Sequence, residues 1–406
     1  MEIKKIAVLG GGTMGGGIIQ VAARAGYHVI LKDIEDRFVE HGIETARRSL
    51  LIAVKRRRIG EEEMKACMER IQGITSYDGF DDVDMVIEAT PEMMKIKKQV
   101  YQELEEVCPE RSIFCSNTSS LSITEMSAAT RRPEKFIGMH FFNPAQVMRL
   151  VEVIPALQTA EETTDTVMDI VRRMDKVPVR VQECAGFLVN RILIPWMHEA
   201  LWTLSEGAAD ALVIDKAITE AGYPMGPYVL LDLVGIDIAL NAARTLYESY
   251  GLRHAIPPLL EKLVERGRYG KKAGKGIYTN GVLDEEVVEL ITEIRKETGI
   301  VRTEFTPERL ILREVNEAIY CLQEGIATAE DIDLAMVLGT NFPHDRSTGI
   351  GGPLHWADEK GLDWVLDRLE HYRDMLGERF WPHPMLKRYV AAGWLGQKTG
   401  RGFFIY

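Results

Sequence analysis

The sequence predicts an α/β domain with a mostly parallel sheet, followed by two tandem all-α domains. Three observations favour this architecture: an apolar run near the start breaks into glycines, strand-like runs alternate with helical stretches up to about Cys184, and the helical half contains a repeat. At 406 residues the chain is long for one core, and about 150 residues per domain suggest two or three domains. We expect domains at 1–183, 184–302 and 303–406.

The first 33 residues place a strand, a glycine turn, a helix, a second strand and an acid in that order. Gly10 permits a tight turn, Gly12 lets the backbone approach a pyrophosphate, and Gly15 lets the helix pack on the strand. The helix N-terminus offers unpaired N–H groups to phosphates. Asp33 lies 23 residues after Gly10, near the spacing at which a carboxylate binds the adenosine ribose, which favours NAD over NADP. This pattern is the Rossmann fingerprint, and it predicts cofactor contacts at Gly10, Gly12, Thr13, Met14, Gly15 and Asp33.

The rest of the first domain continues the alternation of strands and helices. Strand-like runs recur at 83–88, 112–116, 135–142 and 150–154. The crossover after the second strand is unusually long, because residues 34–73 contain two helix-like stretches and the basic run at 55–58. By itself, such a charged run is most simply a solvated helix face.

The helical half repeats itself. Arg191, Glu199, Ile214 and Asp215 match Arg309, Glu317, Ile332 and Asp333 at a constant offset of 118 residues. Further on, the closing segments YGKKAGKGIY at 269–278 and LGQKTGRGFF at 395–404 match at an offset of 126, so the second copy contains an insertion, which we place at 344–350. A repeat of this kind predicts two domains built on one plan.

Composition excludes several classes of protein. A net charge of −12 argues against nucleic acid or an anionic membrane as the main partner. Five cysteines without CxxC spacing suggest neither a disulfide framework nor a zinc site, so we expect reduced thiols and no metal. The first strand begins within a few residues of the start, and no apolar run approaches about 18 residues. The sequence therefore predicts a cytoplasmic protein.

A histidine and a glutamate in the later strands suit acid–base chemistry. Alone among apolar neighbours, His140 is more simply a structural residue. Glu152, however, lies within the apolar run LVEVI, where an ionised carboxylate is rarely left unpaired. If two adjacent strands bring the two side chains together, the carboxylate fixes the tautomer of the ring and raises the basicity of its other nitrogen. The pair could then take a hydroxyl proton during hydride transfer.

In the order and spacing of seven segments, the chain resembles the L-3-hydroxyacyl-CoA dehydrogenase family over residues 1–282. The segments are GGGTMG at 10–15, EATPEMMKIK at 88–97, SNTSSLSIT at 116–124, GMHFFNP at 138–144, LVEVI at 150–154, GFLVNR at 186–191 and GYPMGP at 222–227. The resemblance implies NAD-dependent oxidation of L-3-hydroxyacyl-CoA to 3-ketoacyl-CoA, in fatty-acid or related acyl-CoA metabolism.

The resemblance also implies roles for the matching residues. His140 matches the catalytic base and Glu152 its partner; Ser119 matches the serine between substrate oxygen and nicotinamide, and Asn190 an asparagine from the helical domain. The further positions expected to line the cofactor are Glu92, Lys97, Asn117, Ser119, Asn143 and Lys272.

Coenzyme A recognition is implied for the helical excursion. Ser49 and Arg56 match the pair that holds coenzyme A, together with Ser119 at the reacting end of the substrate. The basic run at 55–58 then has a function, because an acidic protein that binds a nucleotide phosphate tail needs local positive charge.

The main departure from the simplest family members is the second helical copy. Glu308 stands where the first copy has Asn190, and the longer FPHDRSTGIGGP replaces the GYPMGP turn. We expect this copy to be structural and to pair with the first as an internal pseudo-dimer, so that the whole chain is a monomer or a homodimer.

Two alternatives stay open. Dehydrogenases of sugar acids or carnitine share the architecture and the His–Glu pair but bind no coenzyme A, and Ser49 with the basic run argues against them. A non-catalytic nucleotide-binding or structural protein with this fold is disfavoured by the intact set of Ser119, His140, Glu152 and Asn190.

Overall fold

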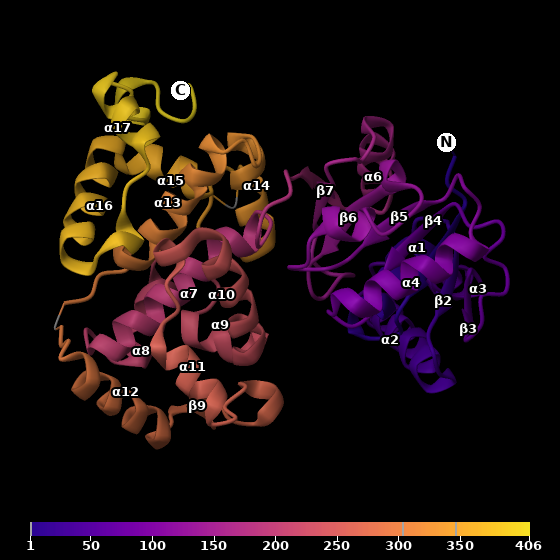
Figure 1. The fold of residues 1–406 in the computed structure, drawn as a ribbon, viewed down its shortest axis with the longest axis horizontal. Coiled ribbons are helices and arrows are strands. Elements are labelled where there is room, and N and C mark those ends of the chain that lie inside the picture. The colour runs from indigo at the N-terminus through magenta and orange to yellow at the C-terminus, as the bar shows by residue number, and fades with distance from the viewer. Residues whose placement is uncertain (1, 303, 346) are drawn as a thin grey trace. The chain divides into compact units, whose positions relative to one another are not determined.

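A computed structural model describes residues 2–302, 304–345 and 347–406. The chain divides into two compact units, Met1–Phe187 and Leu188–Tyr406 (Figure 1). The first is α/β and the second almost entirely helical, which confirms the predicted fold class. The boundary expected at residue 303 lies outside the described residues, and the division of the second unit into two domains stays a prediction.

An eight-stranded sheet forms the centre of the described part of unit 1, in the order β3-β2-β1-β4-β5-β6-β7-β8. Every neighbouring pair is parallel except β6 and β7, which are antiparallel. The strands are β1 (Lys5–Leu9), β2 (His28–Lys32), β3 (Ile71–Ile74), β4 (Met85–Glu88), β5 (Ile113–Ser116), β6 (Phe136–Phe141), β7 (Leu150–Pro155) and β8 (Val177–Arg180). Most of their residues are buried, as expected of a parallel sheet whose strands form apolar runs.

Helices connect these strands. They are α1 (Thr13–Arg24), α2 (Asp36–Lys55), α3 (Glu61–Glu69), α4 (Met94–Val107), α5 (Ile123–Ser127), the 3-10 turn η1 (Pro133–Lys135) and α6 (Glu161–Arg173). The predicted excursion therefore consists of α2 and α3, and the chain re-enters the sheet at β3. The short strands β3 and β8 were not predicted, because neither has a long apolar run.

In unit 2, the described helices recur in the same order in both copies of the repeat. The first series is α7 (Val189–Glu206), α8 (Ala211–Glu220), α9 (Pro227–Val234), α10 (Ile236–Tyr250), η2 (Gly251–His254), α11 (Pro258–Glu265) and η3 (Lys271–Ala273). The second is α13 (Glu308–Gln323), α14 (Ala329–Thr340), α15 (Pro353–Lys360), α16 (Leu362–Leu376), η4 (Glu378–Phe380), α17 (Pro384–Ala391) and η5 (Gln397–Thr399). Between them lie the hairpin β9 (Tyr278–Thr279) and β10 (Val282–Leu283) and helix α12 (Glu285–Thr298).

Each of the two closing segments packs a glycine against an equivalent aspartate, Asp232 in the first copy and Asp358 in the second. Two backbone N–H groups of the first segment donate to Asp232 at 2.7 and 2.9 Å, and two of the second donate to Asp358, both at 3.0 Å. A Cβ atom at Gly276 or Gly402 would lie 1.9 Å from the carboxylate oxygen. The two positions are therefore glycine because the aspartate fills the space of a side chain.

Helices α7 and α13 pack together through reciprocal ion pairs. Arg191 Nε donates to Glu317 Oε1 at 2.8 Å, and Arg309 Nε donates to Glu199 Oε1 at 2.7 Å. All four side chains are at most 3% exposed. Since Arg309 and Glu317 are the repeat equivalents of Arg191 and Glu199, each copy gives its arginine to the other copy's glutamate. A pair of identical surfaces related by a two-fold axis produces this exchange.

The helix pair also encloses a carboxyl group that lacks a cationic partner among the described residues. Glu314 of α13 is fully buried and accepts a hydrogen bond from the Tyr223 hydroxyl. Burial raises the pKa of Glu314 to about 8, although the tyrosine hydrogen bond opposes the shift. The carboxyl group is therefore protonated in the folded protein at neutral pH.

We expect Glu314 to make the protein less stable at alkaline pH. Above pH ~4.5 the unfolded chain has released this proton while the folded chain keeps it up to pH about 8, so the contribution of Glu314 to stability declines as pH rises through this window. The free energy of unfolding in urea should fall less between pH 6 and pH 9 for Glu314→Gln than for the unmutated protein. We expect the two falls to differ by roughly 1–3 kcal/mol. The exposed Glu330→Gln is the control, and an equal loss in all three proteins would show that Glu314 does not titrate in this way.

Candidate active site

Three parallel strands end beside one another at the predicted cofactor site. β1 lies between β2 and β4, so their carboxyl ends meet at one edge of the sheet. Gly10 follows β1, and Asp33 follows β2. The Asp33 Oδ2 atom accepts a hydrogen bond from the N–H of Gly11 at 2.6 Å, and its Oδ1 atom accepts one from Ile34. The structure thus brings the acid of the fingerprint to the glycine turn.

The glycine turn leaves room for a phosphate. Gly10 has φ +102°, and a Cβ there would lie 2.4 Å from the Ala89 carbonyl oxygen. A Cβ at Gly15 would lie 1.7 Å from the Gly10 oxygen, whereas one at Gly12 would have no neighbour among the described residues within 4 Å. Gly12 is the N-cap residue of α1, which has no side-chain cap and no acid in its first turn. Because backbone N–H groups and the helix dipole face this open space, the residues fit the pyrophosphate of a dinucleotide.

The predicted contact between His140 and Glu152 is formed. His140 of β6 lies directly opposite Glu152 of β7 in the antiparallel register, so the two side chains are on the same face of the sheet. The distance from His140 Nδ1 to Glu152 Oε2 is 2.7 Å, with 8% of the histidine side chain and none of the glutamate exposed. The rings of Phe142 and Phe187 lie 4.6 and 5.9 Å from the imidazole. With Nδ1–H directed at the carboxylate, Nε2 is the nitrogen that can accept a proton.

The turn after β5 is fixed beside this pair. The side-chain oxygen of Asn117 accepts a hydrogen bond from the N–H of Phe141, one residue after His140, at 2.8 Å. Ser119 donates from its backbone N–H to Glu92 Oε1 at 2.9 Å and from its hydroxyl at 3.3 Å. Asn143 follows the end of β6. Asn117, Ser119 and Asn143 therefore lie near the same edge of the sheet as His140.

Glu92 connects this turn to a buried ion pair. Its Oε2 atom lies 3.3 Å from Lys97 Nζ, which donates to Glu88 Oε1 at 2.7 Å. Burial raises the pKa of Glu92, but the Lys97 ammonium and the hydrogen bonds from Thr118 and Ser119 outweigh burial and lower it. Glu88, which lies next to this turn, was not predicted as a candidate site residue from the sequence. The signal was present, because an acid at the end of the apolar strand MVIE needs a partner as Glu152 does.

Two predicted site residues belong to unit 2. Asn190 is half-buried in the first turn of α7. Lys272, in η3, forms an ion pair with Asp237, with 2.6 Å between Nζ and the carboxylate. The second copy has the same pair, Lys398 with Asp363, at 2.5 Å. This repetition indicates that the Lys272–Asp237 contact belongs to the helical fold, and a cofactor role for Lys272 stays a prediction.

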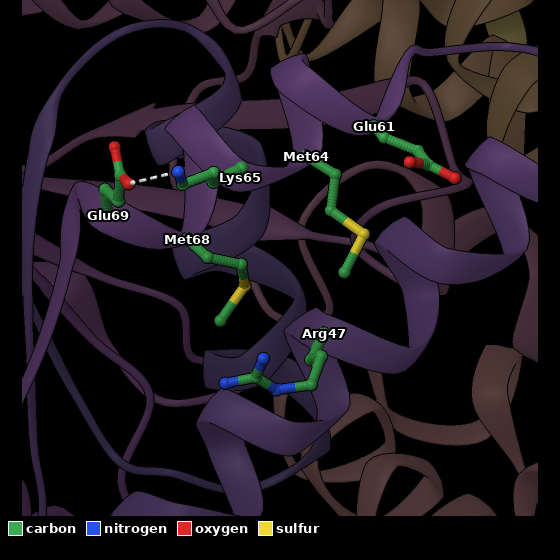
Figure 2. Close-up of a pocket in the computed structure, with 6 residues that line it drawn as sticks. All are labelled: Arg47, Glu61, Met64, Lys65, Met68 and Glu69. Carbon is green, nitrogen blue, oxygen red and sulfur yellow. Dashed lines mark ion pairs between the residues drawn. The ribbon is translucent and has the colours of Figure 1, made fainter.

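The residues predicted to hold coenzyme A lie on α2 and just after it. Ser49 is half-buried, and Arg56, seven residues on, is exposed together with the rest of the basic run at 55–58. A separate hollow of about 360 Å³ lies between α2 and α3 (Figure 2). Met64 and Met68 form its apolar side, and Lys65 at its edge is paired with Glu69 at 3.9 Å. None of the predicted site residues lines this hollow.

Metal ligands, thiols and membrane-spanning helices were each sought among the described residues. The described part of the chain contains no group of three or more His, Cys, Asp or Glu side chains arranged to hold a metal ion. All five cysteines are free thiols. Among the helices of the described ranges, none combines the length and apolarity needed to cross a membrane.

Comparison with known proteins identifies the family. Residues 5–184 match the model of the 3-hydroxyacyl-CoA dehydrogenase NAD binding domain. The model of the C-terminal domain of the same family matches twice, at 186–280 and 305–406. A fatty acid oxidation complex subunit alpha from Shewanella amazonensis is 40% identical over 402 residues, covering 97% of this chain and 56% of the relative. One from Idiomarina loihiensis is 37% identical with the same coverage, so the chain spans about half the length of these relatives.

Solved structures agree. The 3-hydroxybutyryl-CoA dehydrogenase of Escherichia coli K12 matches with a TM-score of 0.86 at 29% identity, over 97% of this chain and 99% of that one. The (S)-3-hydroxybutyryl-CoA dehydrogenase of Ralstonia eutropha matches with a TM-score of 0.67 at 38% identity, over 68% of this chain and 99% of that one. The chain therefore belongs to the 3-hydroxyacyl-CoA dehydrogenase family of NAD-dependent oxidoreductases.

Proposed function

We propose that the protein oxidises L-3-hydroxyacyl-CoA to 3-ketoacyl-CoA reversibly, with His140 as the base. The observation that carries this proposal is the buried His140–Glu152 contact of 2.7 Å at the sheet edge that also holds the glycine turn. Family membership supports the substrate class and NAD as the cofactor.

The residues of the chain divide the chemistry between them. When bound, NAD supplies the acceptor for the hydride that leaves C3 of the substrate. His140 Nε2 takes the proton of the C3 hydroxyl, so the C–H and O–H bonds break as the C=O bond forms. Glu152 stabilises the resulting imidazolium across the contact with Nδ1. In the reverse direction, the imidazolium returns the proton. Ser119 orients the reacting oxygen, and we assign a second orienting contact to Asn190.

Coenzyme A binding is proposed for Ser49 and Arg56. The exposed basic run at 55–58 supports this, because a nucleotide phosphate attracts guanidinium groups through charge-assisted hydrogen bonds. Free cysteines are consistent with a reducing, cytoplasmic location, which we also propose.

We propose that the second helical copy is structural. Its reciprocal arginine–glutamate pairs with the first copy support an internal pseudo-dimer. Glu308 begins α13 at the position equivalent to Asn190, so the second copy lacks the orienting amide. The protein is then a monomer, or a homodimer through another surface.

The first prediction of the proposed function is the cofactor preference. Because the Asp33 carboxylate would repel a 2′-phosphate, NADH should be used much faster than NADPH in the reduction of acetoacetyl-CoA. Asp33→Ser should reduce this preference, measured as the ratio of kcat/KM for the two cofactors. Equal use of both cofactors by the unmutated protein would contradict the role of Asp33.

The second prediction concerns the base. His140→Gln should lower kcat for acetoacetyl-CoA by roughly 10²- to 10⁴-fold, because an amide cannot exchange the proton. NADH binding, followed by fluorescence titration, should change little. His28→Gln, exposed at the start of β2, is the matched control and should retain full activity. Near-normal kcat for His140→Gln would contradict the assignment of His140 as the base.

The third prediction separates coenzyme A recognition from chemistry. Arg56→Ala should raise KM for acetoacetyl-CoA, while KM for the N-acetylcysteamine thioester, which lacks the nucleotide phosphates, stays unchanged. Arg48→Ala removes an exposed arginine of α2 that pairs with Glu44 and serves as the control. If Arg56→Ala raised KM equally for both substrates, the basic run would be a solvated helix face without a role in coenzyme A binding.

A further inference from the structure

Glu88 is a buried carboxylate at the carboxyl end of β4 that the proposed mechanism does not use. It is 0% exposed. Its Oε1 atom accepts hydrogen bonds from Lys97 Nζ at 2.7 Å and from the N–H and hydroxyl of Thr90 at 2.7 and 2.6 Å. Its Oε2 atom accepts from the hydroxyls of Ser116 at 2.7 Å and Tyr101 at 3.4 Å. So complete a set of donors fixes the carboxylate in one orientation.

Lys97 connects Glu88 with the more exposed Glu92. The lysine side chain is 1% exposed, so its ammonium cannot turn to water. It lies between two carboxylates, 2.7 Å from Glu88 and 3.3 Å from Glu92, and also donates to the Thr90 carbonyl at 3.3 Å. The attraction of Glu88 therefore determines how closely the ammonium approaches Glu92.

Glu92 in turn holds the turn that contains Ser119. Its Oε1 atom accepts from the Thr118 hydroxyl at 2.6 Å and from the N–H of Ser119 at 2.9 Å, with the Ser119 hydroxyl at 3.3 Å. Its Oε2 atom faces Lys97. If the ammonium lost Glu88, it would draw Glu92 toward itself and away from Ser119.

We propose that Glu88 is a positioning residue for Ser119, acting through Lys97 and Glu92. The buried charge of Glu88 holds the ammonium against β4 and leaves Glu92 free to bind the serine. The inference rests on the proposed function only in that Ser119 meets the reacting oxygen. The series of contacts itself is independent of the substrate.

Glu88→Gln tests the proposal, because it keeps the volume and an acceptor oxygen but removes the charge. We expect kcat for acetoacetyl-CoA to fall roughly 10- to 100-fold, the size of effect that a small misplacement of a reacting group produces. Glu105→Gln is the matched control: Glu105 is also buried and ion-paired, to Arg132 at 2.8 Å, and its carboxylate accepts hydrogen bonds from Arg131 and Arg132. The control should keep its kcat even if it melts at a lower temperature.

A double-mutant cycle with Ser119→Ala identifies the route. If Glu88 acts through the serine, Glu88→Gln should slow Ser119→Ala no further, whereas independent effects would multiply and overturn the inference. A Ser119→Ala variant with normal kcat would instead count against the proposed function of Ser119. If Glu88→Gln fails to fold, Glu88→Asp replaces it in the cycle, because the shorter side chain keeps the charge but moves it away from Lys97 Nζ, which Glu88 Oε1 contacts at 2.7 Å.

A readout without catalysis completes the test. In Ser119→Cys, the neighbouring Glu92 carboxylate disfavours the thiolate, so the introduced thiol should react slowly with Ellman's reagent at pH 7. Adding Glu88→Gln should accelerate that reaction several-fold, and adding Glu105→Gln should not. An unchanged rate in the Glu88→Gln background would overturn the inference, whatever the activity of the enzyme.

Discussion

An ionised carboxylate inside this protein must be surrounded by donors, and both units are arranged around this requirement. Glu88 is paired with Lys97 and Glu199 with Arg309 of the other helical copy, and removing one partner of such a buried ion pair typically costs about 3–5 kcal/mol, because the other charge stays buried and uncompensated. Glu152 instead contacts the ring nitrogen Nδ1 of His140. The contacts of Glu152 and Glu88 lie at the candidate active site, and that of Glu199 joins the two helical copies. The need to pair a buried carboxylate therefore shapes both the site and the packing of the helices.

The two helical copies have the same residue types at the buried arginine–glutamate pairs of α7 and α13. Arg191 and its equivalent Arg309 are the same residue type, as are Glu199 and Glu317, and a change at any of these positions would leave a buried charge of the other copy unpaired. The carboxylates Asp232 and Asp358 are also shared, whereas other positions at the interface differ. Glu314 is equivalent to Trp196, and the first copy's Tyr223 supplies the hydroxyl that the carboxyl group needs. The interface is therefore two-fold in its ion pairs and asymmetric in the groups around them.

The fold class and most strands could be predicted because they depend on local patterns: apolar runs, a glycine turn and an offset repeat. Glu152 could be found because an acid in an apolar strand is conspicuous, and Glu88 was overlooked although the same argument applied to it. The reciprocal arginines could not be predicted as pairs, because the partner of each lies more than 100 residues away and only the packing of α7 on α13 selects it. Roles for Asn190, Lys272, Ser49 and Arg56 still rest on the resemblance.

The antiparallel strand β7 explains why the acid–base pair is where it is. In a fully parallel sheet, residues at one edge come from strand ends separated by a crossover. Here the chain reverses directly from β6 into β7, so Glu152 faces His140 only 12 residues after it. Ser119, by contrast, reaches the same edge by the parallel route, at the turn after β5, and needs Glu92 to fix it. The two groups of side chains are thus held by different means: strand register aligns His140 with Glu152, whereas Glu92, which also contacts Lys97, binds Ser119.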